Sequence, residues 1–341
     1  MNKLYLLLIM AICLEGCTSN TQSEIHQSDR SNVFDVRQNV HEIPMDEVLI
    51  GSIARLFLLN DYLIIADCKS VDEQIRLFDN RDFSYVFSVA PFGEGPDEIT
   101  NMGNIVTNET KNEFYVSDHA KQKIFCYNMD SLLIDSMCPP TIKARMDELE
   151  FPSNYHYFND TLSIGVFIRP TGVSGYNQVI ARWNMKTGMV TPMSYEHPQI
   201  EKKRVSMDVS EQYDIYVEGY LYHDLLTICK TDGSLVCNIY GPDWNDKRSN
   251  KKSYYRKVAF YNDKIVALQS GQDTFYNDKM NGTRSLLPTK FLIFDIQGNY
   301  IKTLDVGYRI SDFCCDTKNE RLIMNFDDDI QFGYLDLKGI I

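Results

Sequence analysis

Short apolar runs separated by polar turns recur along most of this chain. Residues 53–89 carry four of them, "IARLFLL", "YLIIAD", "QIRLFD" and "FSYVFSV". Residues 103–137 carry another four, "GNIVT", "EFYVSD", "QKIFCYN" and "SLLIDSM". Runs of this length with Asn, Asp and Gly between them are typical of strands joined in hairpins. No helical periodicity recurs in the same way, so the pattern predicts four-stranded antiparallel units.

Later units keep the same turn chemistry although their strands are less regular. Glycine follows a polar bend in four of them, at Gly188, Gly233, Gly298 and Gly339. Glycine there supplies the positive φ of a tight turn. These turns are spaced by roughly 40–65 residues, close to the period of known propeller repeats. The units from the third onward are expected at 151–195, 205–241, 254–306 and 308–337.

The last of these units offers only three strands. The segment 34–43, "FDVRQNVHEI", is the predicted fourth, and its pairing would join the two ends of the chain. Such closure removes exposed sheet edges. The sequence therefore predicts an all-β, six-bladed β-propeller of four-stranded antiparallel blades over residues 33–341, closed by an N-terminal strand. A β-sandwich remains the alternative.

The N-terminus has the features of an export signal. Lys3 precedes an apolar run over 4–14, which is too short to cross a bilayer as a helix. The run ends in Leu-Glu-Gly-Cys at 14–17, which resembles the lipobox of bacterial lipoproteins, although Glu15 departs from the small or apolar residue usual there. The resemblance implies that residues 1–16 are a signal peptide and that Cys17 is acylated. A soluble secreted protein is the alternative.

The residues after Cys17 are polar and contain few large apolar side chains. The segment 17–32 is therefore expected to be a flexible tether between a membrane and the propeller. Multiple acyl chains give stable anchoring. The predicted location is the bacterial envelope, with the outer membrane favoured and the leaflet undetermined.

A longer resemblance covers residues 55–130. "FGEGPDEITNMGNIVTNETKNEFYVSDHAKQKIFCYN" at 92–128 resembles an NHL-type propeller repeat. With the lipobox, it is similar to the TolB-like six-bladed propeller lipoproteins of Bacteroides-type bacteria. The stretch "PFGEGPDEI" at 91–99 lacks the Gly-Lys-Ser/Thr of a phosphate-binding loop, and its three acidic residues would repel an anion. We interpret it as a bend between two units.

The formal net charge of −13 argues against a nucleic-acid partner, which would need clustered Lys and Arg. One stretch, 241–257, is basic and aromatic instead. Its candidate partner-binding residues are Trp244, Lys247, Arg248, Lys251, Lys252, Arg256 and Lys257. We expect this loop to bind an acidic glycan, peptide or partner domain, with Trp244 as a stacking anchor. A solvated loop is the alternative, and "EKKR" at 201–204 is a weaker case of the same kind.

Signatures of catalysis and metal binding are weak. The six histidines stand alone, without the spacing of a zinc site, and no Gly-x-Ser-x-Gly elbow occurs. The acidic run 327–329 lacks the alternating spacing of a calcium loop and is interpreted as a hairpin turn. The cysteines beyond Cys17 are expected to be buried free thiols, with a bridge between Cys229 and Cys237 left open.

These observations predict a non-catalytic propeller that binds a protein or glycan at the cell envelope through its loop faces. The alternative is a propeller hydrolase or lyase with a calcium-type metal ion in the central channel, held by acids from several blades. The sequence identifies no cofactor.

Overall fold

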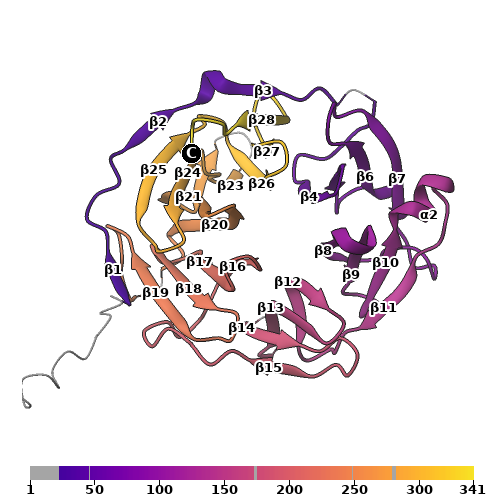
Figure 1. The fold of residues 1–341 in the computed structure, drawn as a ribbon, viewed down its shortest axis with the longest axis horizontal. Coiled ribbons are helices and arrows are strands. Elements are labelled where there is room, and N and C mark those ends of the chain that lie inside the picture. The colour runs from indigo at the N-terminus through magenta and orange to yellow at the C-terminus, as the bar shows by residue number, and fades with distance from the viewer. Residues whose placement is uncertain (1–22, 46, 173–174, 248, 279–281) are drawn as a thin grey trace, which may run out of the picture.

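The structure is a computed structural model that describes residues 23–341 apart from 46, 173–174, 248 and 279–281. Six sheets stand radially around a central axis, so the fold is a six-bladed β-propeller (Figure 1). The prediction of a propeller is confirmed, and the sandwich alternative is wrong. None of the helices in the described part of the chain has the length and hydropathy of a membrane span.

The first three blades are antiparallel sheets of four consecutive strands, numbered from the axis outward. Blade one holds β4 (Arg55–Leu59), β5 (Tyr62–Ala66), β6 (Glu73–Asp79) and β7 (Tyr85–Pro91). Blade two holds β8 (Met102–Asn108), β9 (Glu113–Asp118), β10 (Lys123–Asn128) and β11 (Thr141–Arg145), with the 3-10 helix η3 (Glu109–Lys111) between β8 and β9. Blade three holds β12 (Phe151–Asn159), β13 (Leu162–Pro170), β14 (Tyr176–Trp183) and β15 (Val190–Pro192).

The last three blades each add a short N-terminal strand at their outer edge. Blade four holds β16 (Val205–Ser210), β17 (Ile215–Tyr220), β18 (Leu225–Lys230) and β19 (Leu235–Tyr240), with β1 (Glu24–His26) outside. Blade five holds β20 (Lys252–Tyr261), β21 (Lys264–Asp273), β24 (Lys290–Asp295) and β25 (Tyr300–Asp305), with β2 (Val33–Asp35) outside and a side hairpin of β22 (Phe275–Asp278) and β23 (Gly282–Ser285). Blade six holds β26 (Ile310–Asp316), β27 (Arg321–Phe326) and β28 (Phe332–Asp336), with β3 (Val40–Glu42) outside.

The N-terminal segment 23–43, which we call the strap, runs around the outside of blades four to six (Figure 1). The predicted closing strand 34–43 is confirmed only at its end, where β3 pairs antiparallel with β28. Its beginning pairs parallel with β25 instead, because the 3-10 helix η2 (Arg37–Asn39) interrupts the segment between the two blades. Residues 24–26 of the predicted tether pair parallel with β19. The predicted signal peptide, Cys17 and residues up to 22 lie outside the described part.

One predicted strand is a helix. The run 131–137 was expected to be the outer strand of blade two, but residues 129–134 form α2 (Met129–Ile134). The Asn128 side chain accepts a hydrogen bond from the Ser131 N–H at 3.0 Å and caps the helix. Met129 and Leu132 face the core from this helix. The outer strand of blade two is therefore β11, further along the chain.

Apolar side chains fill the spaces between neighbouring blades. Because side chains alternate across a strand, consecutive residues of one inner strand reach different neighbours. Leu63 and Ile65 of β5 pack toward blade six, whereas Ile64 packs toward blade two. Each junction between adjacent blades has such a cluster among the described residues. Both faces of every sheet are thus buried, which explains why the strands read as nearly continuous apolar runs.

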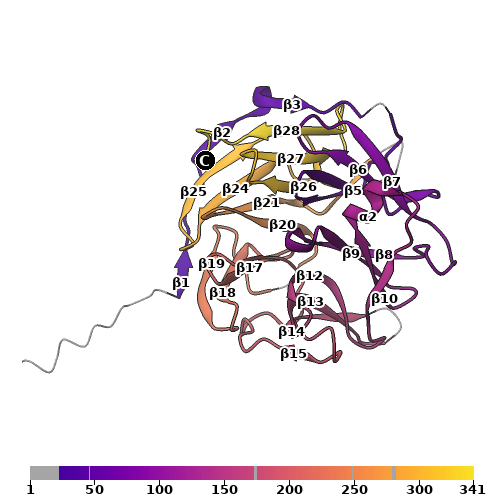
Figure 2. The ribbon, with the colours of Figure 1, turned by 45° about the vertical axis from the view of Figure 1, so that its right-hand side comes forward.

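The antiparallel order gives the ring two distinct faces (Figure 2). The hairpin face, as we call it, carries the turn between the first and second strands of each blade and the turn between the third and fourth. The connection face carries the turn between the second and third strands and the segment that leads to the next blade. The loops of these two faces lie at opposite ends of the strands and form separate surfaces.

Candidate functional site

The stretch 91–99 connects blade one to blade two on the connection face. Phe92 and Ile99 form a bridge across it, and the Glu98 carboxylate accepts a hydrogen bond from the Gly95 N–H at 2.6 Å. A Cβ at Gly93 would lie 2.0 Å from the Glu98 carboxylate, so a larger residue there would displace that side chain from its hydrogen bond. The loop binds its own carboxylate, and its interpretation as a structural bend is confirmed.

Polar contacts link the innermost strands of the six blades into a closed ring around the axis. Each contact is a hydrogen bond that joins one blade to the next. In order around the ring, the bonded groups are Arg55 with the Gly103 carbonyl, Asn104 with Asn154 (2.9 Å), Asn154 with the Met207 carbonyl (3.2 Å), Asp208 with the Phe260 N–H (2.7 Å), Lys257 with Asp312 (2.8 Å) and Asp312 with the Leu56 N–H (2.7 Å). These bonds satisfy polar groups at the open edges of the inner strands.

Two acidic side chains of this ring come from different blades. Asp208 lies in β16 and Asp312 in β26. Burial raises the pKa of Asp208. Both oxygens of Asp312 accept hydrogen bonds, one from the Leu56 N–H and one from Lys257. Within the described ranges, no three His, Cys, Asp or Glu side chains gather as a set that could hold an ion.

The predicted basic loop is divided between a loop and a strand. Residues from Lys252 onward belong to β20, the inner strand of blade five. Lys257 consequently belongs to the polar ring and not to a loop surface. Arg256 lies one position earlier and reaches the Ser285 hydroxyl at 3.3 Å. Strand geometry therefore separates residues that are neighbours in the sequence.

The remaining basic residues lie in the loop before β20 and at the first position of that strand. Lys247 and Lys251 are exposed, and Lys252 pairs loosely with Asp243 at 3.4 Å. Arg248 lies outside the described residues. Among the predicted residues that the structure describes, Lys247 lines a cavity of the connection face.

This cavity, which we call the blade-four cleft, has a volume of about 540 Å³. It lies between the segment before β16, the turn after β17 and the loop after β19. Its lining is polar and consists of Gln199, Glu201, Lys202, His223, Asp246 and Lys247. The weaker basic stretch 201–204 thus meets the predicted loop here. Sequence reasoning missed Gln199 and His223, because only the fold brings their turns to the same cleft.

An aromatic cluster supports the cleft from within. Trp244 is half-buried against Tyr240, with ring centres 4.7 Å apart, and against His197 at 5.5 Å and His223 at 5.8 Å. Burial lowers the pKa of His197, so its ring is neutral and shares a hydrogen bond with the Tyr240 hydroxyl at 3.0 Å. Trp244 thus packs against residues of the cleft region while part of its ring stays exposed, and its role as a stacking anchor stays a prediction.

A buried ion pair fixes the turn that carries His223. The neighbouring Asp224 binds Arg30 of the strap at 2.8 Å, and these side chains are 2% and 8% exposed. Asp224 also accepts the Tyr255 hydroxyl at 2.8 Å. A Cβ at Gly241 would lie 2.0 Å from the Asp224 carboxylate, which explains why the first residue of the loop after β19 is a glycine. The cleft is thereby joined to the strap and to blade five.

The remaining candidates from the sequence are the cysteines and the acidic run 327–329. All cysteines among the described residues are free, and Cys229 and Cys237 are buried. The acidic run 327–329 forms the turn between β27 and β28, where Asp328 pairs with Arg309 at 3.3 Å. The other five described cysteines are partly exposed, so the expected burial holds for two thiols only, whereas the hairpin turn at 327–329 is as expected.

The radial sheets, the polar inner ring and the cleft between loops define the class as a six-bladed β-propeller. Residues 20–182 match the model of a family described as a 6-bladed beta-propeller, DUF5128. No curated protein matches the chain. Two solved structures share the fold at 11% identity. A member of the duf4221 family from Bacteroides vulgatus has a TM-score of 0.56, covering 87% of this chain and 95% of its own. A protein of Bacteroides fragilis, described as a candidate exported protein, has a TM-score of 0.54, with 92% and 97% covered.

Proposed function

We propose that this protein is an exported lipoprotein, acylated at Cys17, whose propeller binds a protein or glycan partner without catalysis. The lipobox-like residues 14–17 support the anchor. The likeness to a protein of Bacteroides fragilis described as a candidate exported protein supports export. The repeat at 92–128 supports a relationship with the TolB-like and NHL-like propeller lipoproteins.

The blade-four cleft is the observation that carries the binding role. Its volume of about 540 Å³ falls within the roughly 300–1,000 Å³ of ligand sites. Lys202 and Lys247 supply cations, and Glu201 and Asp246 supply carboxylates. A lining with both signs suits a neutral glycan or a protein surface of mixed charge. This differs from the acidic partner that the basic sequence alone suggests, because Glu201 and Asp246 offset the two lysines.

The strap would hold the cleft near the membrane. Cys17 precedes Ser23 by six positions, and six residues span at most about 20 Å when fully extended. The strap begins at the outer edge of blade four, the blade that carries the cleft. A partner of the cleft is therefore expected to be another component of the same envelope surface.

Crosslinking of the full-length protein in its native membranes tests this proposal. A lysine-reactive crosslinker should capture a reproducible partner through Lys202 or Lys247, and the Lys247→Glu variant should reduce the yield. Lys338, exposed on the hairpin face, serves as the control position. Equal capture through Lys338 would contradict the assignment of the cleft. Glycan or lactone cleavage that disappears in an Asp208→Asn variant would favour the hydrolase or lyase with a channel site instead.

A further inference from the structure

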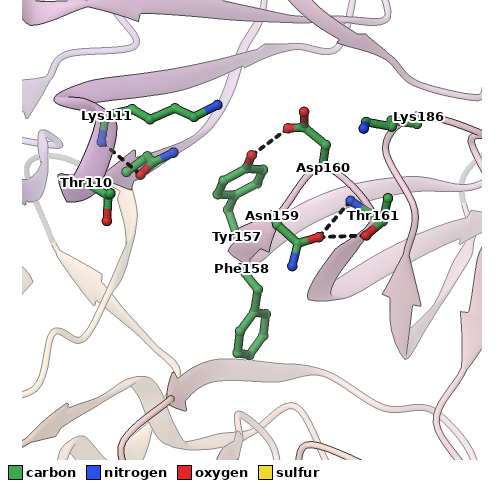
Figure 3. A pocket seen from close by; sticks show the side chains of 9 residues that line it. Thr110, Lys111, Tyr157, Phe158, Asn159, Asp160, Thr161 and Lys186 are labelled. Atoms are coloured by element: carbon green, nitrogen blue, oxygen red, sulfur yellow. Dashed lines mark hydrogen bonds between the residues drawn. The ribbon is translucent and has the colours of Figure 1, made fainter.

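A second cavity opens on the hairpin face, between blades two and three (Figure 3). It has a volume of about 330 Å³, and we call it the hairpin hollow. Its lining comes from the first turns of both blades and from the turn after β14. The lining residues are Asn108, Thr110, Lys111, Tyr157, Phe158, Asn159, Asp160, Thr161 and Lys186. The blade-four cleft lies at the opposite end of the strands, so the two cavities are independent.

The single carboxylate of the hollow is already neutralised. Asp160 binds Lys143 of β11 at 2.6 Å and accepts the Tyr157 hydroxyl at 2.5 Å. These two hydrogen bonds lower the pKa of Asp160 to about 2, and the bond from Lys143 has the larger effect. Lys143 in turn lies over the Tyr115 ring at 4.8 Å, which fixes its position. Asp160 therefore adds little net repulsion toward an incoming anion.

Two lysines face this neutralised pair from opposite sides. Lys111 comes from η3 of blade two and Lys186 from blade three, and both side chains extend toward Asp160 (Figure 3). Both are exposed, and neither belongs to an ion pair among the described residues. With Lys143, the three cations and one carboxylate give a local charge of +2 in a chain whose net charge is −13. Such a reversal of sign favours an anionic ligand.

Neutral polar groups complete the wall of the hollow. The Asn159 side-chain oxygen accepts from Thr161, which leaves its amide NH₂ as a donor. The Thr110 hydroxyl has no hydrogen-bond partner within the described chain and can donate or accept. These groups suit sugar hydroxyls better than the apolar side chains of a peptide.

We propose that the hairpin hollow binds a sugar that carries a carboxylate, such as a uronic acid. The carboxylate lies between the Lys111 and Lys186 ammonium groups, and ring hydroxyls bond to Asn159 and Thr110. The volume of about 330 Å³ is at the small end of ligand sites, so the ligand is a terminal sugar and not a chain segment. Lysine can bind such a carboxylate because its ammonium group is a compact, hydrated charge that requires no fixed bidentate geometry.

Calorimetric titration of the full chain in detergent micelles tests the proposal, with glucuronate as the probe and glucose and inorganic sulfate as comparisons. Glucuronate should bind at least tenfold more tightly than either comparison. Lys111→Ala and Lys186→Ala should each weaken glucuronate about tenfold, the size expected for one charged hydrogen bond. Added salt should weaken binding further, because the lysines are exposed. Lys69→Ala, at an exposed position on the connection face of blade one, should change nothing.

Equal affinity for glucose would overturn the proposal, because the lysines would then have no part in recognition. Equal affinity for sulfate would overturn it as well, since the hollow would then hold a bare anion. Unchanged glucuronate binding in the Lys111→Ala/Lys186→Ala double variant, with an unchanged melting temperature, would place the ligand elsewhere. Failure here leaves the envelope-binding proposal intact, because that proposal rests on the opposite face.

Discussion

Replacement of Arg30 by alanine tests how the strap is held to the ring. The guanidinium binds the Asp224 carboxylate at 2.8 Å, 194 positions away in the sequence, and lies 5.5 Å from the centre of the Phe294 ring. Both partners of the ion pair are almost fully buried. Removing Arg30 leaves the Asp224 charge inside the protein without its cation, which is the costly way to break such a pair.

The size of the effect follows from what remains around Asp224. Breaking a buried ion pair costs about 3–5 kcal/mol. The Tyr255 hydroxyl and the Asp243 N–H still donate to Asp224, so we expect the low end, about 3 kcal/mol. Unfolding entropy of roughly 2.1 cal/mol/K per residue gives about 0.7 kcal/mol/K for this chain. The melting temperature should therefore fall by roughly 4 °C.

The assay compares thermal unfolding of Arg30→Ala with that of Arg81→Ala. Arg81 makes the same chemical pair with Asp79, but its side chain is 77% exposed, and exposed pairs contribute little to stability. Hydrogen exchange of the amides in β1 should quicken in Arg30→Ala and stay unchanged in the control. Equal melting temperatures of the two variants, with unchanged exchange in β1, would refute the claim that burial of this pair fastens the strap.

Three further outcomes are expected. Arg321→Ala should cost about 3–5 kcal/mol in denaturant unfolding, because it leaves Asp316, 3% exposed, without its cation at the junction of blades six and one. The pKa of Asp160 lies at about 2 when folded, below the value of a free carboxyl, so the stability it contributes is lost as the pH falls from about 4 to 2. Asp160→Asn should flatten that part of the pH–stability curve. Maleimide at neutral pH should label half-buried Cys68 well before Cys229, because burial raises the pKa of Cys229 to about 12. Mass spectrometry of the labelled protein gives the order of labelling.

The number of blades was predictable because the inner strands carry apolar residues on both of their faces. Consecutive apolar residues such as Leu63, Ile64 and Ile65 need neighbours on both sides, and only a closed ring supplies these to every unit. The helix α2 was not predictable in the same way. A short apolar run fits either a strand or a helix, and the cap at Asn128 decides in favour of the helix.

The candidate site was only partly predictable, because register and long-range pairing are not local properties. The loop that carries Lys247 was found from its charge. Lys257 was assigned to the same surface, yet its position in β20 turns it toward Asp312. Nothing near Arg30 in the sequence points to Asp224, and the isolated His223 gave no signal. Their roles depend on contacts between segments that are distant in the chain.

The strap runs along three of the six blades, and the two cavities fall on different halves of the ring. Blades four to six each carry a strap strand, β1, β2 or β3, at their outer edge, whereas blades one to three carry none in the described chain. The blade-four cleft lies on the half that carries the strap, and the hairpin hollow lies on the other. Loosening the strap with Arg30→Ala should therefore weaken partner capture at the cleft and leave glucuronate binding at the hollow unchanged. Loss of both would mean that the strap supports the whole ring.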